Sequence, residues 1–557
     1  MNGGGEIQLQ VAFAGHRRVG DMGDADALEQ KLARVCAMLK AAGLRRARLL
    51  TGLADGADEI AAKVWRDEAM GPIHAILPFL HEGHSEVGPQ RAAQTGTWLD
   101  GARLQKAGGS PHFAQTRWLL GGADLLIAVW TGRAKRGLGG TADAIRLAVE
   151  NGIPVLWINP RDETPRLIPP LPMHRREDTV EIIQRLPGSR ASAAAEAQAA
   201  ELQEILELEA PQTEAAWTRG RFDAWLGGWL WRTFALFQRL VGGRPVPPPT
   251  APVPDDLASQ PGFALITSAY LAADDRADKL SGVHRSEQIL LLIAAVAAAA
   301  IGATPVFWPP FKLEAAIGEL TVGLFAFAVW WAAQRSRHHE GWTQARRLAE
   351  QLRLNRAGWA LGVSTRGAGS PSMRHEHLAL ARPILRQAQP PTGDYDVRRV
   401  AAWAPWAMAE LVAGQADYHE RQGSRNRRIS RRVQRAADAG FVIVVIGLVA
   451  TAALSAAPAS ARAWAPHWLV PAAIAAGVIV PAIAAACMAL EARLQFEEQA
   501  ERSAQLVERL RRLEAEVDAR PQLEAAQGAF RAAAEWLLAE ADQWREGSVR
   551  RRLSRGG

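Results

Sequence analysis

Cysteine and tyrosine are scarce in this chain of 557 residues, which has two cysteines, Cys36 and Cys487, and three tyrosines. Two cysteines exclude a disulfide framework, and no Cys or His spacing is typical of a metal site, so we predict no metal and no cofactor. The net charge of +7 is modest for this length, and the densest basic runs flank apolar segments. A nucleic-acid-binding protein concentrates positive charge on one face. We therefore expect no nucleic-acid partner.

The chain also lacks a basic-then-apolar segment at its start, so we expect the N-terminus to stay in the cytoplasm. Its length allows two to four domains. Strand and helix patterns fill the first half, whereas long stretches without charge occur only in the second. We predict a Rossmann-like α/β domain with a doubly wound parallel sheet, followed by an all-α membrane domain with four transmembrane helices and cytoplasmic helices. The expected boundaries are 1–165 for the sheet domain, 166–257 for a helical connector, 258–365 for a first hairpin, 366–490 for a connector with a second hairpin, and 491–557 for C-terminal helices.

Residues 123–160 contain the pattern strand, glycine loop, helix and strand. Leu125–Trp130 and Ile153–Ile158 are apolar strand candidates, and Ala142–Glu150 has helical spacing. Gly139 and Gly140 lie just before this helix, after Gly137. Such a βαβ unit builds a parallel sheet. Its loop directs backbone N–H groups and the positive end of a helix at one spot, which favours a phosphate group.

Two further glycine turns follow strands in the first domain. Leu9–Ala14 ends at Gly15, and Arg48–Thr51 leads through residues 52–58 into a helix over Glu59–Asp67. A third strand is expected over Ile73–Pro78, and an amphipathic helix over Asp26–Ala42. All three turns then lie at the carboxyl edge of one sheet. The candidate ligand-binding residues there are Gly15, His16, Arg17, Gly52, Asp55, Gly56, Thr131, Arg133, Arg136, Gly139, Gly140, Thr141 and Asp143.

Several of these candidates have a purely structural role as the alternative to ligand binding. Gly139, Gly140 and Thr141 would hold a phosphate, and Arg133, Lys135 and Arg136 would either neutralise further phosphates or form a solvated loop. Asp55 and Asp143 would accept from ribose hydroxyls or cap helix N-termini. His16 and Arg17 are expected to contact the ligand. We interpret His81, Glu82 and His84 as a loop without metal-ligand spacing.

These motifs resemble the SLOG superfamily, the Rossmann-like group that contains the DNA-processing protein A fold and the "Lonely guy" nucleotide hydrolases. The matching residues are Gly15-His16-Arg17, Thr51 through Asp58, and Gly139-Gly140-Thr141-Ala142-Asp143, within residues 8–160. In the hydrolase branch a catalytic Glu stands three residues after the Thr, where this chain has Ala144. The resemblance thus implies a nucleotide-derived ligand, with binding favoured over catalysis. If the chain is an enzyme, Asp143 is the substitute carboxylate.

The connector contains an aromatic and basic helix over Trp217–Leu240. Its arginines make a bilayer crossing energetically unfavourable, so we expect this helix to lie in the headgroup layer or to pack on other helices. Residues 242–254 form a proline-rich linker that marks a domain boundary.

Four stretches are long enough to cross a bilayer: Ile289–Phe307, Ala315–Ala333, Ala439–Ala457 and Trp468–Leu490. Arginine crowds the segments after the second stretch and before the third, whereas the turns within each pair carry little charge. The positive-inside rule predicts two hairpins with both termini in the cytoplasm, in a multi-pass membrane protein. The family resemblance implies that this membrane is the inner (plasma) membrane of a bacterium. Glu319 is the one charged residue within a span. It either reaches water near the outer end or faces a bundle interior.

Helices flanking these hairpins resemble the SLOG-associated two-transmembrane (SLATT) modules. The resemblance lies in Tyr270–Lys279, Trp342–Arg353, Tyr418-His419-Glu420 and the helix Glu491–Val517. The four spans are one enlarged module or two fused ones. Leu506, Leu510, Leu513 and Val517 recur at helical spacing, so this helix packs on another helix of the chain or of a neighbouring subunit. The final helix, Leu523–Trp544, places Phe530, Trp536 and Leu537 in a core stripe.

Three functional hypotheses follow. The favoured one is a membrane effector that senses a nucleotide-derived signal and responds, as a homo-oligomer, by forming a pore or disrupting the bilayer. The resemblance places such pairings in bacterial antiviral (antiphage) conflict systems. The alternative is a membrane-tethered nucleotide N-glycosidase acting on NAD or a nucleoside monophosphate. A scaffold with a vestigial pocket is a third possibility.

Overall fold

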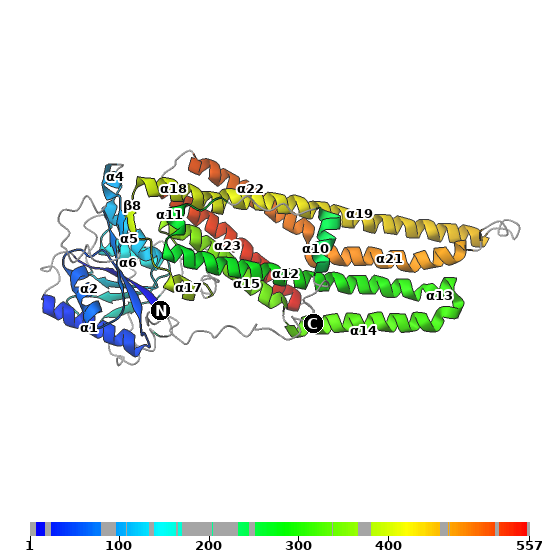
Figure 1. Cartoon of the computed structure of the whole chain (residues 1–557), viewed down its shortest axis with the longest axis horizontal. Helices are drawn as coiled ribbons and strands as arrows, with labels where there is room; N and C mark the ends of the chain where they lie inside the picture. Colours follow the sequence, from blue (N-terminus) through cyan, green and yellow to red (C-terminus); the bar gives the residue numbers. More distant parts are fainter. Residues whose placement is uncertain are drawn as a thin grey trace.

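The structure is a computed structural model of the whole chain, and Figure 1 shows the sheet domain at one end and the long apolar helices at the other. The described residues are 7–16, 24–79, 96–106, 109–132, 139–162, 165–169, 203, 232–243, 251–336, 338–365, 380–456, 466, 468–518 and 523–553, with side chains described as far as 540. Most of the aromatic and basic helix expected over Trp217–Leu240, which we call the Trp-rich segment, lies outside these residues.

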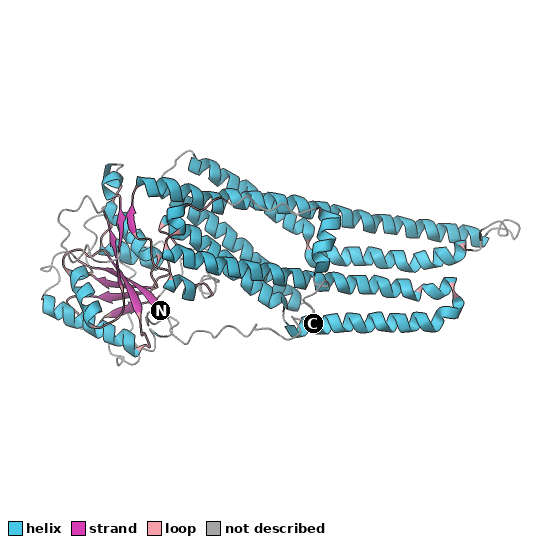
Figure 2. Cartoon of the chain, in the orientation of Figure 1, coloured by secondary structure: helices cyan, strands magenta, loops and turns pink. Residues whose placement is uncertain are grey.

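The sheet domain contains an eight-stranded sheet, drawn in magenta in Figure 2. Its spatial order is β7-β6-β5-β1-β2-β3-β4-β8. The strands are β1 (Leu9–Ala14), β2 (Ala47–Thr51), β3 (Ile73–Leu77), β4 (Gly96–Leu99), β5 (Leu125–Val129), β6 (Val155–Ile158), β7 (Arg166–Ile168) and β8 (Gly393–Tyr395). The five strands predicted from the sequence are confirmed, because burial on both faces of a parallel sheet leaves nearly continuous apolar runs.

The sheet is mixed rather than wholly parallel, since β7 runs antiparallel to β6 while the other neighbouring pairs are parallel. Strands β4, β7 and β8 have three or four residues each and were not predicted. Strand β8 comes from the segment between the two hairpins and pairs with β4, Thr97 standing opposite Gly393. The sheet is therefore completed by a part of the chain almost three hundred residues further on.

Helices cover both faces of the sheet. On one face, α1 (Ala25–Ala41) and α2 (Ala57–Asp67) enclose an apolar core that includes Leu9, Leu49 and Ile127. On the other face lie α5 (Pro111–Gly121) and α6 (Thr141–Glu150), and a short α4 (Gly101–Lys106) precedes them. The core around α5 and α6 continues without a break into the helices between the sheet domain and the apolar segments, because residues such as Leu361 and Phe530 belong to the same cluster.

The second half is helical. Its elements are α10 (Thr233–Phe237), α11 (Asp255–Ala258), α12 (Pro261–Gly302), α13 (Thr304–Phe307), α14 (Lys312–Ser336), α15 (His338–Leu361), α17 (Arg382–Gln387), α18 (Val397–Met408), α19 (Gly414–Ala456), α21 (Leu469–Leu494), α22 (Phe496–Asp518) and α23 (Leu523–Leu553). Within the described residues, four helical segments are long and apolar enough to cross a membrane, and they contain the four predicted stretches. We therefore treat the chain as a membrane protein.

The four apolar segments lie in a row. Helix α14 packs on α12, α12 packs on α21, and α21 packs on α19, the order visible in Figure 1. Most of their large apolar side chains point outward, such as Leu320 and Leu324 on α14 and Ile446 and Leu448 on α19. Outward-facing apolar side chains suit hydrocarbon, or the surface of another copy.

Helix α12 is a single rod from the sheet domain to the outer end of the first hairpin. Its 42 residues, at about 1.5 Å each, span about 63 Å. The flanking segment Tyr270–Lys279 and the first span are therefore parts of one helix. The stripe on α22 is confirmed: Leu506, Leu510 and Leu513 are buried within this chain, with Val517 packed beside them.

Candidate ligand site and its connection to the membrane helices

The order of the strands creates a switch point between β1 and β5. From β1 the chain builds outward through β2, β3 and β4, and then returns to place β5 on the other side of β1. In open α/β sheets, ligands bind in the crevice at the carboxyl ends of the two strands where the order reverses. His16 follows β1 and Thr131 follows β5, so both lie at this position.

His16 and Thr131 are in contact. The backbone N–H of Thr131 donates to Nε2 of His16 at 3.3 Å, and the Thr131 hydroxyl lies 3.5 Å from the same nitrogen. The backbone carbonyl of His16 accepts from the N–H of Ala57, the first residue of α2. One histidine thereby joins the ends of two strands to the start of a helix.

The glycine loop before α6 packs against α5 at Gly139 and is exposed to solvent at Gly140. Gly139 has a φ of +86°, and a Cβ there would collide with the backbone of His112 and Phe113 on α5. A Cβ on Gly140, by contrast, would meet no heavy atom within 4 Å. Gly140 is the exposed N-cap of α6 and lacks a side-chain cap. The positive end of this helix therefore has room for an anion.

The carboxylate of Asp143 is occupied by contacts with the glycine loop and with α6. Its carboxylate accepts from the N–H of Gly139 at 2.9 Å and lies 3.6 Å from the guanidinium of Arg146, and the residue is 2% exposed. Gly139 therefore has no N–H available for a phosphate. Thr141 is also buried, at 9% exposed. Among the described residues 139–141, Gly140 is the one with an exposed backbone.

The turn after β2 lies beside this position. Gly52 packs against the side chains of Gln115 and Asp58, and Gly15 packs against Ala57. Gly56 is the N-cap of α2, and Asp55 next to it is exposed. The predicted arginines Arg17, Arg133 and Arg136 lie outside the described residues, as do Lys135, Gly137, His81, Glu82 and His84.

No family model, no curated protein and no solved structure matches this chain. The function of this chain is therefore inferred from its own sequence and geometry.

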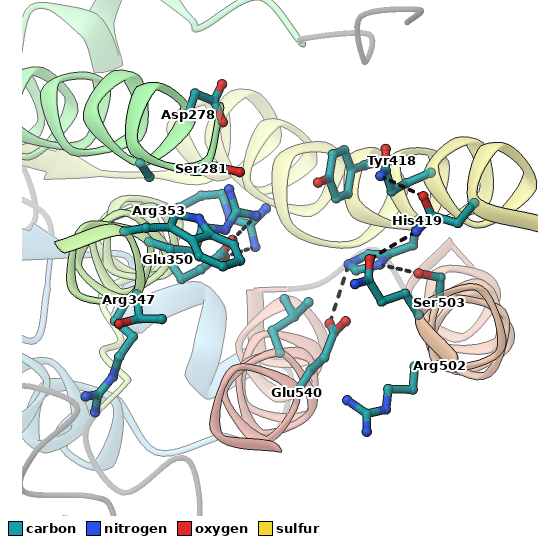
Figure 3. A pocket seen from close by; sticks show the side chains of 18 of the residues that line it. Asp278, Ser281, Arg347, Glu350, Arg353, Tyr418, His419, Arg502, Ser503 and Glu540 are labelled. Carbon is teal, nitrogen blue, oxygen red and sulfur yellow. Dashed lines mark hydrogen bonds and ion pairs between the residues drawn. The ribbon is translucent and has the colours of Figure 1, made fainter. Parts of the chain in front are cut away.

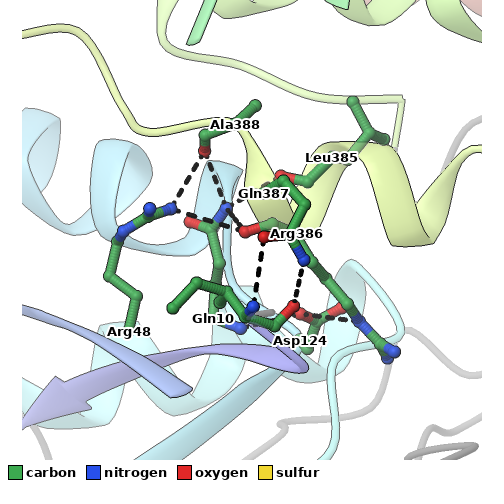
Figure 4. A network of polar contacts seen from close by, with 8 residues as sticks. Gln10, Arg48, Asp124, Leu385, Arg386, Gln387 and Ala388 are labelled. Atoms are coloured by element: carbon green, nitrogen blue, oxygen red, sulfur yellow. Dashed lines mark hydrogen bonds and ion pairs between the residues drawn. The ribbon is translucent and has the colours of Figure 1, made fainter. Parts of the chain in front are cut away.

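The amino edge of the sheet, opposite the glycine turns, is clamped by the end of α17, as Figure 4 shows. The Gln10 amide donates to the carbonyls of Leu385 and Ala388 at 2.9 and 3.0 Å. Arg48 donates to the carbonyl of Ala388 at 3.1 Å, and Arg386 pairs with Asp124 at 3.3 Å. Burial, reinforced by the charge of the nearby Arg46, lowers the pKa of Arg48 to about 10.

Strand β8 is held in turn by the first membrane helix. The side-chain oxygen of Gln260, the N-cap residue of α12, accepts from the backbone N–H of Thr392 at 3.1 Å and from its hydroxyl at 3.2 Å. On the other side of the same segment, the Thr97 hydroxyl of β4 donates to the carbonyl of Pro391. A continuous chain of contacts thus runs from β4 through residues 391–395 to α12.

Helix α10 lies across the bases of the spans. Phe234 is buried against Ile289, Ile429 and Phe496, and its N–H donates to the hydroxyl of Ser286 at 3.0 Å. Leu236 and the following Leu240 point outward, 58% and 71% exposed. The described end of the Trp-rich segment therefore packs on other helices and also offers an apolar surface at the level of the junction.

Glu319 lies on α14 two turns after its start, near the outer end of the first hairpin. A side chain on Gly302, the last residue of α12, would collide with its carboxylate. Glu319 is exposed in the single chain and faces the neighbouring helix terminus.

Sequence reasoning missed the clamp at the amino edge. A signal was present, because Gln10 and Arg48 are polar residues inside otherwise apolar strands, where a polar side chain needs a buried partner. The partner could not be named, since residues 385–388 lie more than 330 positions away in the sequence.

Proposed function

We propose that this chain is a membrane effector that binds a nucleotide-derived ligand at the carboxyl edge of its sheet and passes the binding signal to its membrane hairpins. One observation carries the proposal: β8, which lies between the two hairpins in the sequence, belongs to the sheet whose switch point forms the candidate site. A movement of this sheet and a movement of the hairpins are therefore mechanically linked.

Three features support a phosphate-bearing ligand. The switch point places His16 and Thr131 together, the N-terminus of α6 opens toward solvent at Gly140, and α6 is long enough to have a helix dipole. A nucleotide-derived molecule has the phosphate that such a helix end attracts. This assignment agrees with the resemblance of the motifs to the SLOG superfamily.

The response would occur in the membrane. A ligand changes a protein only through a difference in its affinity for two states. The continuous helix α12 begins at Pro261, and its N-cap residue Gln260 contacts Thr392 next to β8, so a shift of the sheet edge reaches the first span directly. We propose that the row of four spans forms a pore or disrupts the bilayer when several copies assemble, because a row, unlike a ring, needs partners to enclose a lumen.

The cellular role follows from the same resemblance. We propose that the chain resides in the bacterial inner membrane with both termini in the cytoplasm, as a SLOG domain fused to SLATT-type hairpins that acts in antiphage defence. The apolar stretches and the arginine-rich flanks between the hairpins support this orientation.

The geometry favours binding over hydrolysis. A general acid or nucleophile must reach the scissile bond, and Asp143 is buried beneath the loop with its carboxylate engaged by Gly139 and Arg146. To act on a nucleotide, Asp143 would have to give up both contacts.

Gly140→Leu tests the ligand site. The new side chain has space, and Gly140 has a φ of −81°, so the chain should fold. The same side chain would cover the helix N-terminus, and we expect at least a tenfold loss of nucleotide affinity. The measurement is titration calorimetry of the purified full chain with a panel of cyclic, linear and ADP-ribose-type nucleotides.

Glu150→Gln is the matched control for folding, because it alters an exposed carboxylate at the opposite end of α6, away from the candidate site. If the Gly140→Leu chain binds the best nucleotide of the panel as tightly as the wild type, the site at α6 is wrong.

A further inference from the structure

A polar cavity lies among the cytoplasmic ends of the membrane helices, away from the sheet. It has a volume of about 220 Å³, far above the ~15 Å³ that a single water needs. Its walls come from α12, α15, α19, α22 and α23. In Figure 3, Glu350 and Arg353 of α15 lie on one side, and His419 of α19 with Glu540 of α23 on the other.

Positive charge dominates the wall of this cavity. Five arginines and three carboxylic acids line it. Glu350 is already held by Arg353 and, at 2.5 Å, by Arg346, and Arg346 also lies 3.5 Å from Asp274. Burial raises the pKa of Glu540 to about 7, which leaves this carboxyl partly neutral near pH 7. Asp278 is exposed at the mouth of the cavity.

Two arginines of this cavity, Arg353 and Arg285, can still bind an anion. Arg353 is 7% exposed, and its Nε has no hydrogen-bond partner among the described residues. The guanidinium of Arg285 lies over the rings of Phe234 and Trp342, at 5.0 and 5.3 Å from their centroids, and forms no ion pair with a carboxylate in the described parts of the chain. Burial lowers the pKa of Arg285, and the positive charge of Arg346 adds to this shift. A buried positive charge without a counter-ion is unfavourable until an anion arrives.

We propose that this cavity binds a phosphate-bearing anion through Arg285 of α12 and Arg353 of α15. Guanidinium groups are the side chains best suited to phosphate, because their planar N–H groups can form two parallel bonds to its oxygens. The hydroxyl groups of Ser281 and Tyr418, which also line the cavity, can donate to the remaining oxygens.

Occupancy of the cavity would fix the two hairpins relative to each other. The lining parts of α12 and α15 are the cytoplasmic ends of the first hairpin, and those of α19 and α22 are the ends of the second. An anion bridging them favours the arrangement in which all four ends are close together. The phosphate belongs either to a soluble metabolite or to the headgroup of an anionic lipid, since the cavity lies next to the membrane-spanning segments.

The test uses the full chain with Gly140→Leu, which removes the proposed sheet site, in nanodiscs of phosphatidylcholine. The probe is inorganic pyrophosphate, and the measurement is titration calorimetry. We expect saturable binding that weakens at least tenfold on Arg285→Gln and on Arg353→Gln. Ser281→Trp fills the cavity without removing a charge and should have the same effect.

The control is Arg512→Gln, on an exposed part of α22, which should leave binding unchanged. Size-exclusion profiles identify any variant that fails to fold.

A second arm uses nanodiscs containing phosphatidylglycerol. If this lipid displaces pyrophosphate, or is retained in native mass spectra of the wild type but not of Arg285→Gln, the phosphate is that of a headgroup. If pyrophosphate binds equally in both nanodiscs, the ligand is soluble. The proposal is overturned if neither pyrophosphate nor the anionic lipid binds, or if binding ignores Arg285→Gln, Arg353→Gln and Ser281→Trp alike. Since Gly140→Leu is present throughout, these outcomes are independent of the sheet site.

Discussion

At the scale of single residues, a buried histidine joins the sheet to the segment that leads toward the membrane helices. His74 on β3 is 1% exposed, and its Nε2 lies 2.9 Å from the hydroxyl of Thr97. This hydroxyl donates to Pro391, so Nε2 of His74 must carry the proton and Nδ1 is left without a partner among the described residues. Burial, reinforced by the charge of Arg48, lowers the pKa of His74 to about 3.

Acid should therefore destabilise the folded chain through His74. Its folded pKa of about 3 lies below the ordinary value of 6.5, so the unfolded chain binds a proton that the folded chain does not. The free energy of unfolding should fall by up to about 1.4 kcal/mol per pH unit as the pH drops below about 6.5. His74→Gln keeps an N–H donor for Thr97 and does not titrate. We expect a flatter dependence of its thermal midpoint on pH, measured on the full chain in detergent; parallel curves for variant and wild type would contradict this assignment.

At the scale of elements, β8 and α12 act as a pair. Gln260 has a single side-chain oxygen that accepts both hydrogen bonds from Thr392, which places the start of the first membrane helix against the edge strand. The Tyr395 side chain then fixes the other end of β8, packing at 4.7 Å from the ring of Trp118 on α5 and donating to the carbonyl of Ala360 on α15. The edge of the sheet is thus held by the helices that continue into the membrane.

Gln260→Ala should loosen this junction. The variant leaves the N–H of Thr392 without its partner, at a cost of about 1–3 kcal/mol. Faster hydrogen exchange is expected over residues 392–395, measured by mass spectrometry on the full chain. Ser259→Ala is the control, because Ser259 is exposed and its hydroxyl bonds only locally to Asp256. Equal exchange in both variants would show that Gln260 does not hold the strand.

Local sequence patterns predict some of the strands but not others. Long apolar runs and glycine turns predict β1, β2, β3, β5 and β6, because each strand is buried on both faces. Strand β8 has the sequence Gly-Asp-Tyr, and two of these three residues are poor strand formers. It forms because β4 supplies its hydrogen-bond partners and Gln260 holds the preceding residue, Thr392, and no local pattern contains this information. The same holds for the cavity: Arg346 and Arg353 look from the sequence like ordinary positive-inside charges, and only the packing of α15 on α12 and α19 gives them a shared wall.

At the scale of the whole molecule, the two hairpins should enter the membrane from the same side. In a chain lacking Cys36 and Cys487, Pro310→Cys places a thiol in the exposed turn of the first hairpin, and Ser424→Cys places one on an exposed part of α19 before its apolar stretch. A membrane-impermeant maleimide should label the first in intact spheroplasts and the second only after permeabilisation. Labelling of Ser424→Cys in intact cells would reverse the orientation.

The central claim is that a ligand at the carboxyl edge of the sheet changes the state of the membrane helices. Its most direct test is dye leakage from liposomes that contain the purified full chain, with the nucleotide panel added outside to chains oriented with their sheet domains exposed. We predict that at least one nucleotide triggers leakage by the wild type, and that Gly140→Leu abolishes the response while leaving the chain folded and inserted. Leakage that is the same with and without every nucleotide, or an unchanged response in Gly140→Leu, would contradict the account.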